Sequence, residues 1–220
     1  MSDLAITIII ILCTGVLVFM IFFFTSSKKR RMENELKEYC NSHGYTYSRK
    51  DGNLRKEVII EGDMFLLTSI LTMSPDFSES DSQAHNQKTV WSTDKSNGAW
   101  PAFALGSIPI AGNWADFSDS IKNSAIEMLM METGQNFDTT NVRQVDSLGG
   151  KTYLLFEQMP GEGYNIIQKL KPFLSDWPKT SVLFVNCRPE KIYIQITDYF
   201  VKSTELLEKV LHLGTALREL

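Results

Sequence analysis

Apolar residues are concentrated at the start of the chain, where residues 4–24 contain no charged side chain. A helix rises about 1.5 Å per residue, so these 21 residues form a helix roughly 30 Å long, which is the thickness of the hydrocarbon core of a bilayer. The pattern therefore predicts a transmembrane helix over residues 4–25, preceded by a short extracytosolic tail of residues 1–3.

Two other interpretations of this apolar run fit its pattern less well. A cleaved secretory signal has a basic start, an apolar stretch of about 7–15 residues and small residues at its cleavage site. Here no Lys or Arg precedes the run, which ends in three phenylalanines, Phe22 to Phe24. A buried core helix of a soluble protein is seldom apolar on all sides over this length. We therefore expect a retained signal-anchor that contacts the lipid bilayer through residues 4–24.

Four cations follow the apolar run almost at once: Lys28, Lys29, Arg30 and Arg31. Cations close to a membrane span are retained on the cytoplasmic side, and none precedes the run. We therefore expect the N-terminus outside and the rest of the chain in the cytosol, with a bacterial inner membrane as the expected location. The same cations can contact anionic lipid headgroups, but we interpret them as a stop-transfer flank and not as a site of specific lipid recognition. Residues 26–43 are expected to form this basic flank and a helix that ends before Gly44.

Residues 44–220 alternate between short strand patterns and three helical patterns. Period-two alternation is clearest at Ile192, Ile194 and Ile196, and short turns join most neighbouring strand patterns. The helical patterns run from a cap at Asp116 or Ser118 to Gly134, from Tyr164 to Trp177, and from a cap at Ser203 to Leu217. Pro172 is expected to kink or split the second helix. Polar residues 74–88 are expected to form a loop between strands.

This order of elements predicts the fold class. Few helices and many strands joined by short turns are typical of an α+β domain with a mainly antiparallel sheet. We therefore expect one soluble domain over residues 44–220, with about three helices packed on the sheet.

The charge balance of the soluble part limits its partners. The chain has 22 Lys and Arg and 26 Asp and Glu; without the four flanking cations and Asp3, 18 cations and 25 carboxylates remain, a net charge of −7. Sequence-independent binding of nucleic acid needs clustered cations. An acidic domain of this kind is not expected to bind nucleic acid.

Few residues of the sequence match the pattern of a catalytic, metal-binding or cofactor-binding site. The spacing of Cys and His matches no structural zinc site, and no glycine-rich phosphate loop or nucleophile elbow occurs, so neither metal nor cofactor is expected. Cys40 and Cys187 should be free thiols in the cytosol, whereas the reverse topology would make them candidates for a disulfide. There are three candidate catalytic groups: the pair Cys40 and His43, then His212, and then Asp198. The pattern around Cys40 is more typical of a packed thiol, that around His212 of a solvated helix face, and that around Asp198 of a strand end.

Aromatic side chains offer the better candidates for a binding surface. We interpret Trp91, Trp100, Phe103 and Trp114 as partner-binding residues, with ordinary core packing as the alternative. The resulting hypothesis is a membrane-anchored protein whose cytosolic domain binds or regulates a protein partner and is not an enzyme. The alternative is a membrane-tethered enzyme whose site is assembled from distant strands and the C-terminal helix.

Overall fold

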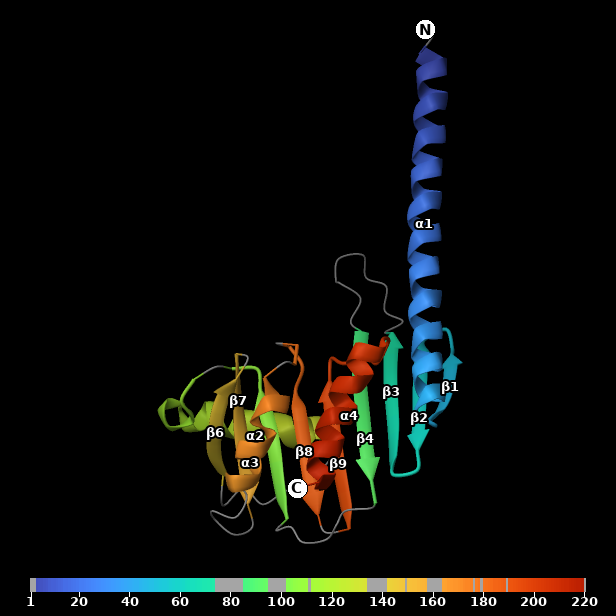
Figure 1. Cartoon of the computed structure of the whole chain (residues 1–220). Helices are drawn as coiled ribbons and strands as arrows, with labels where there is room; N and C mark the ends of the chain where they lie inside the picture. The colour runs from blue at the N-terminus through green and yellow to red at the C-terminus, as the bar shows by residue number, and fades with distance from the viewer. Residues whose placement is uncertain are drawn as a thin grey trace.

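The computed structural model describes residues 3–73, 85–94, 102–110, 112–133, 142–148, 150–157, 164–175, 177–178, 180–188 and 190–219. Within these residues the fold is α+β, with four α-helices and one nine-stranded sheet in which all strand pairs are antiparallel (Figure 1). The predicted α+β class with a mainly antiparallel sheet is therefore confirmed.

Helix α1 (Asp3–Ser42) is continuous over 40 residues and projects from one edge of the domain (Figure 1). By length and composition it is the one described helix that is long and apolar enough to cross a membrane. Its side chains from Leu12 to Phe24 are exposed, which excludes a buried core helix. The last turns of α1 are instead part of the domain, and Gly44 (φ 73°) follows its end as predicted.

The sheet is built from local hairpins and from pairs between distant strands. Its order is β1-β2-β3-β4-β9-β8-β5-β7-β6, so β4 lies beside β9, and β5 lies between β8 and β7. The strands are β1 (Thr46–Asp51), β2 (Arg55–Gly62), β3 (Phe65–Met73), β4 (His85–Thr93), β5 (Phe103–Ile108), β6 (Val142–Leu148), β7 (Lys151–Glu157), β8 (Leu183–Arg188) and β9 (Lys191–Thr197).

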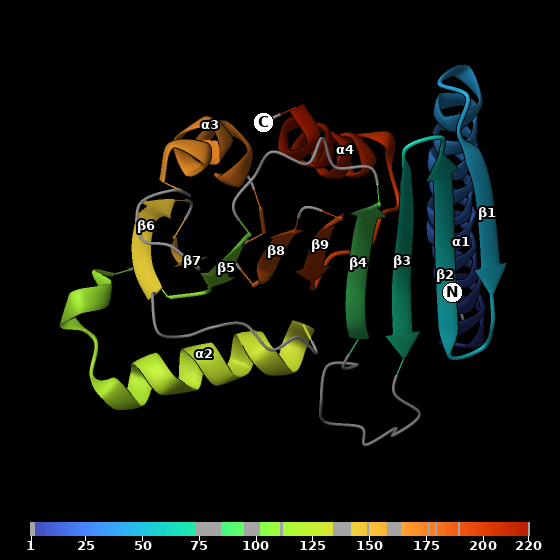
Figure 2. The same cartoon turned by 90° about the horizontal axis from the view of Figure 1, so that it is seen from below.

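Helices cover both faces of this sheet (Figure 2). The end of α1, α4 (Thr204–Glu219) and α3 (Tyr164–Leu174) pack on one face and enclose the larger core. Helix α2 (Asp119–Thr133) and the short 3-10 helix η1 (Trp114–Asp116) lie on the other face, over the β5–β7 half of the sheet. On that face, no described helix covers β1 to β4.

The prediction that Pro172 splits the second helix is wrong. Helix α3 is undivided and ends at Leu174, not at Trp177, because Pro172 lies in its last turn and does not interrupt its middle. The Trp177 indole N–H donates a hydrogen bond back to the Phe173 carbonyl (2.9 Å).

The larger core is packed closely around Trp91, whose side chain is 1% exposed. Gly214 of α4 lies against its ring, and a Cβ at this position would be 2.5 Å from a ring carbon. Helix α4 can approach the sheet this closely because residue 214 has no side chain.

Candidate functional site

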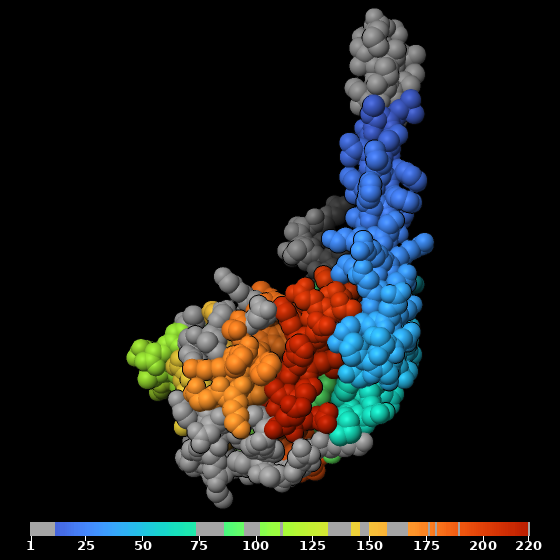
Figure 3. Space-filling view, in the orientation of Figure 1, coloured from blue at the N-terminus to red at the C-terminus, as the bar shows by residue number. Residues whose placement is uncertain are grey.

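A groove of about 490 Å³ lies where α1 leaves the domain. It begins at Thr25, directly after the apolar run, and is formed by α1, by β1 to β3 and by the segment that precedes α4. Figure 3 shows the lower part of α1 beside α4 on the surface of the domain. The lining residues are Thr25, Lys28, Lys29, Met32, Glu33, Leu36, Tyr47, Arg49, Lys56, Val58, Leu71, Phe200, Val201 and Lys202.

The charges that line this groove are mostly positive, although the domain as a whole is acidic. Five cations and one carboxylate, Glu33, belong to its lining. Arg49 is held in ion pairs, whereas no ion pair within the described residues involves Lys28, Lys56 or Lys202. The groove therefore has a surplus of positive charge available to a ligand.

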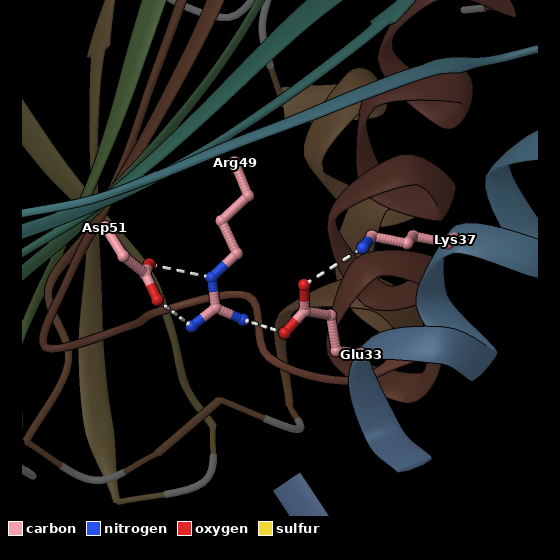
Figure 4. Close-up of polar contacts among 4 residues, drawn as sticks. All are labelled: Glu33, Lys37, Arg49 and Asp51. Atoms are coloured by element: carbon pink, nitrogen blue, oxygen red, sulfur yellow. Dashed lines mark hydrogen bonds and ion pairs between the residues drawn. The ribbon is translucent and has the colours of Figure 1, made fainter. Parts of the chain in front are cut away.

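A chain of ion pairs forms one wall of the groove and fastens α1 to β1 (Figure 4). Lys37 Nζ lies 3.1 Å from Glu33, whose other oxygen lies 2.8 Å from Arg49 Nη1. The Arg49 guanidinium also makes two contacts with Asp51, at 2.8 and 2.9 Å. Its hydrogen bonds hold the pKa of Asp51 below its ordinary value.

A buried pair of hydroxyls fixes the opposite wall. The Ser69 and Thr89 hydroxyls lie 2.8 Å apart, and Thr89 donates to the Tyr199 carbonyl (2.6 Å). The Val201 N–H donates to the Ser69 hydroxyl (2.9 Å). These bonds hold the chain that carries Lys202 against the sheet.

Tyr47 contributes a buried polar atom to the groove. Its hydroxyl oxygen is enclosed and has no hydrogen bond within the described residues. Burial and the nearby Glu33 raise the pKa of Tyr47, against the lowering effect of Arg49. A buried polar group without a partner is uncommon, because it has lost its hydrogen bonds to water.

The predicted basic flank is divided by the structure. Lys28 and Lys29 line the groove, whereas Arg31 pairs with Glu35 on the exposed side of α1 (2.8 Å). Arg30 is exposed and does not belong to the lining. Two of the four cations of the predicted flank therefore belong to a site that also includes residues distant in sequence, such as Lys202.

Two of the four predicted aromatic contact residues are buried in the core. Trp91 and Phe103 are 1% and 4% exposed, because strand alternation directs both into the larger core. Trp114 is half-buried and packs on Phe117 with ring centroids 5.9 Å apart, and its backbone N–H donates a hydrogen bond to the Gln144 side-chain oxygen. Trp100 lies outside the described residues.

The candidate catalytic groups have separate environments. Cys40 is 0% exposed, and burial raises the pKa of its thiol to about 11, so it is protonated at neutral pH. His43 Nδ1 lies 2.8 Å from the Tyr39 carbonyl, as expected of a histidine at a helix end. His212 is exposed on α4, and Asp198 is an exposed turn residue with φ 52°. Within the described residues, no group of three or more His, Cys, Asp or Glu could hold a metal ion.

Lys151 is a buried ionisable group that the sequence does not mark. It is 1% exposed, and its Nζ donates to the Ser181 hydroxyl (2.7 Å) and to the Ser181 carbonyl. Burial lowers the pKa of Lys151 to about 8. The one available signal is its position at the start of an apolar strand, which does not distinguish it from an exposed strand end.

A second surface lies on the face of β1 to β4 that no described helix covers. Ser48, Ile59, Thr68 and Val90 form one row across the four strands, each paired with the next. Ile59, Thr68 and Val90 alternate along their strands with buried core residues, Ser48 alternates with half-buried ones, and all four are themselves half-buried or exposed. We call this face of β1 to β4, with the row at its centre, the open sheet face.

Comparison of this chain with models of protein families, with curated proteins and with solved structures gives no match. The groove, the open sheet face and the helix that leads to them are the features from which a function can be inferred.

Proposed function

We propose that this protein is a single-pass membrane protein, with its N-terminus outside and its α+β domain in the cytosol, and that the domain binds or regulates a protein partner at the membrane. The expected location is a bacterial inner membrane. The observation that carries the proposal is that α1 continues without a break from the apolar run into the domain core, where Leu36 and Cys40 are 2% and 0% exposed.

This continuity supports a role that depends on orientation. A flexible linker keeps a domain near a membrane but leaves its orientation free. Here the helix itself is packed into the domain, and the ion pairs of Glu33 and Arg49 add a second attachment. A domain held in one orientation presents the same surface to every molecule in the same membrane. The cytosolic orientation is supported by the four cations that follow the apolar run.

Binding is better supported than catalysis. Cys40 is buried as a thiol, and His212 and Asp198 are exposed on a helix and in a turn. A catalytic site needs a nucleophile or an acid–base pair within hydrogen-bond reach of each other, and none of these three residues supplies one within the described part of the chain.

We propose the open sheet face as the surface that contacts the protein partner. Its central row has apolar Ile59 and Val90 beside polar Ser48 and Thr68, a mixture typical of interfaces that form and dissociate. Leu66, on the same face, is 45% exposed.

Site-specific photo-crosslinking in intact cells tests the proposal. A photoreactive residue at Thr68 should give a discrete adduct with another protein. The same residue at Thr215, exposed on α4, is the control. The same strains, carrying a reporter fused after Leu220, should show reporter activity in the cytosol. The proposal fails if both positions give the same adducts or none, or if the reporter is active only outside the cytosol.

A further inference from the structure

We propose that the groove between α1 and the sheet binds one anionic phospholipid from the leaflet that α1 enters, with its phosphate held by the lysines of the groove. This inference rests on the proposed membrane anchor, but it does not depend on the protein partner.

The position of the groove matches the membrane surface. Its lining begins at Thr25, immediately after the apolar run, and extends along α1 to Leu36. The eleven helical steps from Thr25 to Leu36 cover about 16 Å, so the groove runs from the headgroup region into the cytosol. A lipid of the surrounding leaflet can therefore reach its mouth without leaving the bilayer.

The charge of the groove selects an anion. Four lysines from three separate parts of the chain, Lys28 and Lys29, Lys56, and Lys202, meet in the same lining. Lys56 and Lys202 come from the soluble part, whose net charge is −7 without the flanking cations, and they meet Lys28 and Lys29 of the flank. The opposite end of β2 has the reverse balance: a hollow of about 310 Å³ is lined by three carboxylates, Glu61, Asp63 and Asp94, and one cation, Lys191. The domain thus places its positive end toward the membrane and its negative end away from it, which favours anionic headgroups.

The remaining lining suits a lipid better than a free anion. Met32, Leu36, Val58, Leu71, Phe200 and Val201 give the groove apolar walls. Such walls add nothing to the binding of inorganic phosphate but can pack on glycerol carbons and on the first methylenes of an acyl chain. Tyr47 lies in the same lining, and its enclosed hydroxyl has no hydrogen bond within the described residues.

Native mass spectrometry of the full-length chain in a non-ionic detergent tests the inference. Dioleoyl-phosphatidylglycerol and dioleoyl-phosphatidylcholine have the same acyl chains, so a difference in binding reports the headgroup charge. The variant Lys56→Gln/Lys202→Gln removes two cations from the groove. Its control, Lys169→Gln/Lys191→Gln, removes the same charge from exposed positions outside the groove lining.

We expect the wild-type chain to bind phosphatidylglycerol in preference to phosphatidylcholine. Each cation near a membrane surface is worth about fivefold in affinity, so the groove variant should bind phosphatidylglycerol roughly 25-fold more weakly. The control variant should bind as the wild type does. Phosphatidylglycerol should also raise the unfolding temperature of the wild type and the control, because a ligand of the folded state stabilises it, and should raise that of the groove variant less.

Several results would overturn the inference. Equal loss in the two double variants would mean general attraction by charge, and equal binding of the two lipids would mean no selection of anions. Displacement of the lipid by glycerol 3-phosphate at the same concentration would mean a soluble phosphate ligand. A protein adduct, and no lipid adduct, from a photoreactive residue at Leu71 in cells would mean that a protein segment occupies the groove.

These failures can be separated from failure of the membrane anchor. If α1 is not a membrane anchor, the untagged chain will leave the membrane fraction on washing with alkaline carbonate. If the chain stays in the membrane and the lipid results are negative, only the lipid inference is lost.

Discussion

Separating Glu33 from Arg49 should measurably weaken the attachment of α1 to the domain. The two side chains are 25% and 15% exposed, and their closest atoms are 2.8 Å apart. Exposed pairs contribute roughly 0.2–1 kcal/mol, while breaking a fully buried pair costs about 3–5 kcal/mol. This pair lies between the two cases, and Arg49 keeps Asp51 as a second partner. We therefore expect a coupling energy of about 1 kcal/mol between Glu33 and Arg49.

A double-mutant cycle measures this coupling energy directly. Glu33→Gln, Arg49→Met and the double variant are prepared as full-length chains in detergent micelles, and the free energy of unfolding is measured by denaturant titration. Arg49→Met alone should be the more destabilising single change, because it also leaves Asp51 without its guanidinium. The cycle subtracts that effect.

The matched control is a second cycle for Arg31 and Glu35, which pair at the same 2.8 Å but are 82% and 49% exposed and lie on one helix. Its coupling energy should be about 0.3–0.5 kcal/mol. If the Glu33–Arg49 coupling is no larger than about 0.3 kcal/mol, the ion-pair chain does not attach α1 to the sheet, and burial of Leu36 and Cys40 alone does so.

Three further changes test the packing of α4 on the sheet, the hydroxyl pair beside the groove and the buried Lys151 on β7, each through the free energy of unfolding of the full-length chain. Gly214→Ala should destabilise by about 2 kcal/mol, since contact with the Trp91 ring outweighs a gain of about 1 kcal/mol in helix propensity. Ser69→Ala should cost about 1–3 kcal/mol, because the buried Val201 N–H loses its acceptor. Lys151→Met should remove a rise in stability of about 3 kcal/mol between pH 8 and 10.5: the unfolded chain binds the lysine proton in this window and the folded chain, with its pKa lowered to about 8, does not.

Each of these changes has a control. Thr215→Ala, exposed beside Gly214, should stabilise by up to about 0.7 kcal/mol, and a Gly214→Ala variant as stable as the wild type would contradict the close packing. Ser48→Ala, on the exposed side of β1, should change stability by less than about 0.5 kcal/mol, and an equal effect at Ser69 would refute its role. The exposed variant Lys169→Met should show the same rise of the free energy of unfolding with pH as the wild type. If Lys151→Met also shows that rise, burial of the charged Lys151 does not destabilise the folded chain.

Local patterns along the chain predict the elements well. The alternation of Ile192, Ile194 and Ile196 predicts β9, and Gly44 marks the end of α1, because period and backbone conformation depend on neighbours in sequence. Pro172 illustrates the limit of such patterns. Its effect on a helix depends on its distance from the helix end, and sequence patterns locate helix ends only to within a few residues.

The groove could not be predicted from the sequence. Lys28 and Lys29 were recognisable as a membrane flank, but Lys56 and Lys202 are single cations in unremarkable surroundings. They meet because β2 pairs beside β1 under α1, and because Ser69 and Thr89 hold the chain before α4 against the sheet.

The amino-acid sequence by itself determined a long apolar helix at the start of the chain, its basic flank, an acidic remainder and an α+β fold with an antiparallel sheet. Each of these follows from composition or from a period of two or 3.6 residues. Only the tertiary structure decided that Trp91 and Phe103 are core residues, that β4 lies beside β9, and that four lysines line one groove. The physical reason is that burial and contact between distant residues depend on how all the apolar faces are covered at once, which no local pattern records.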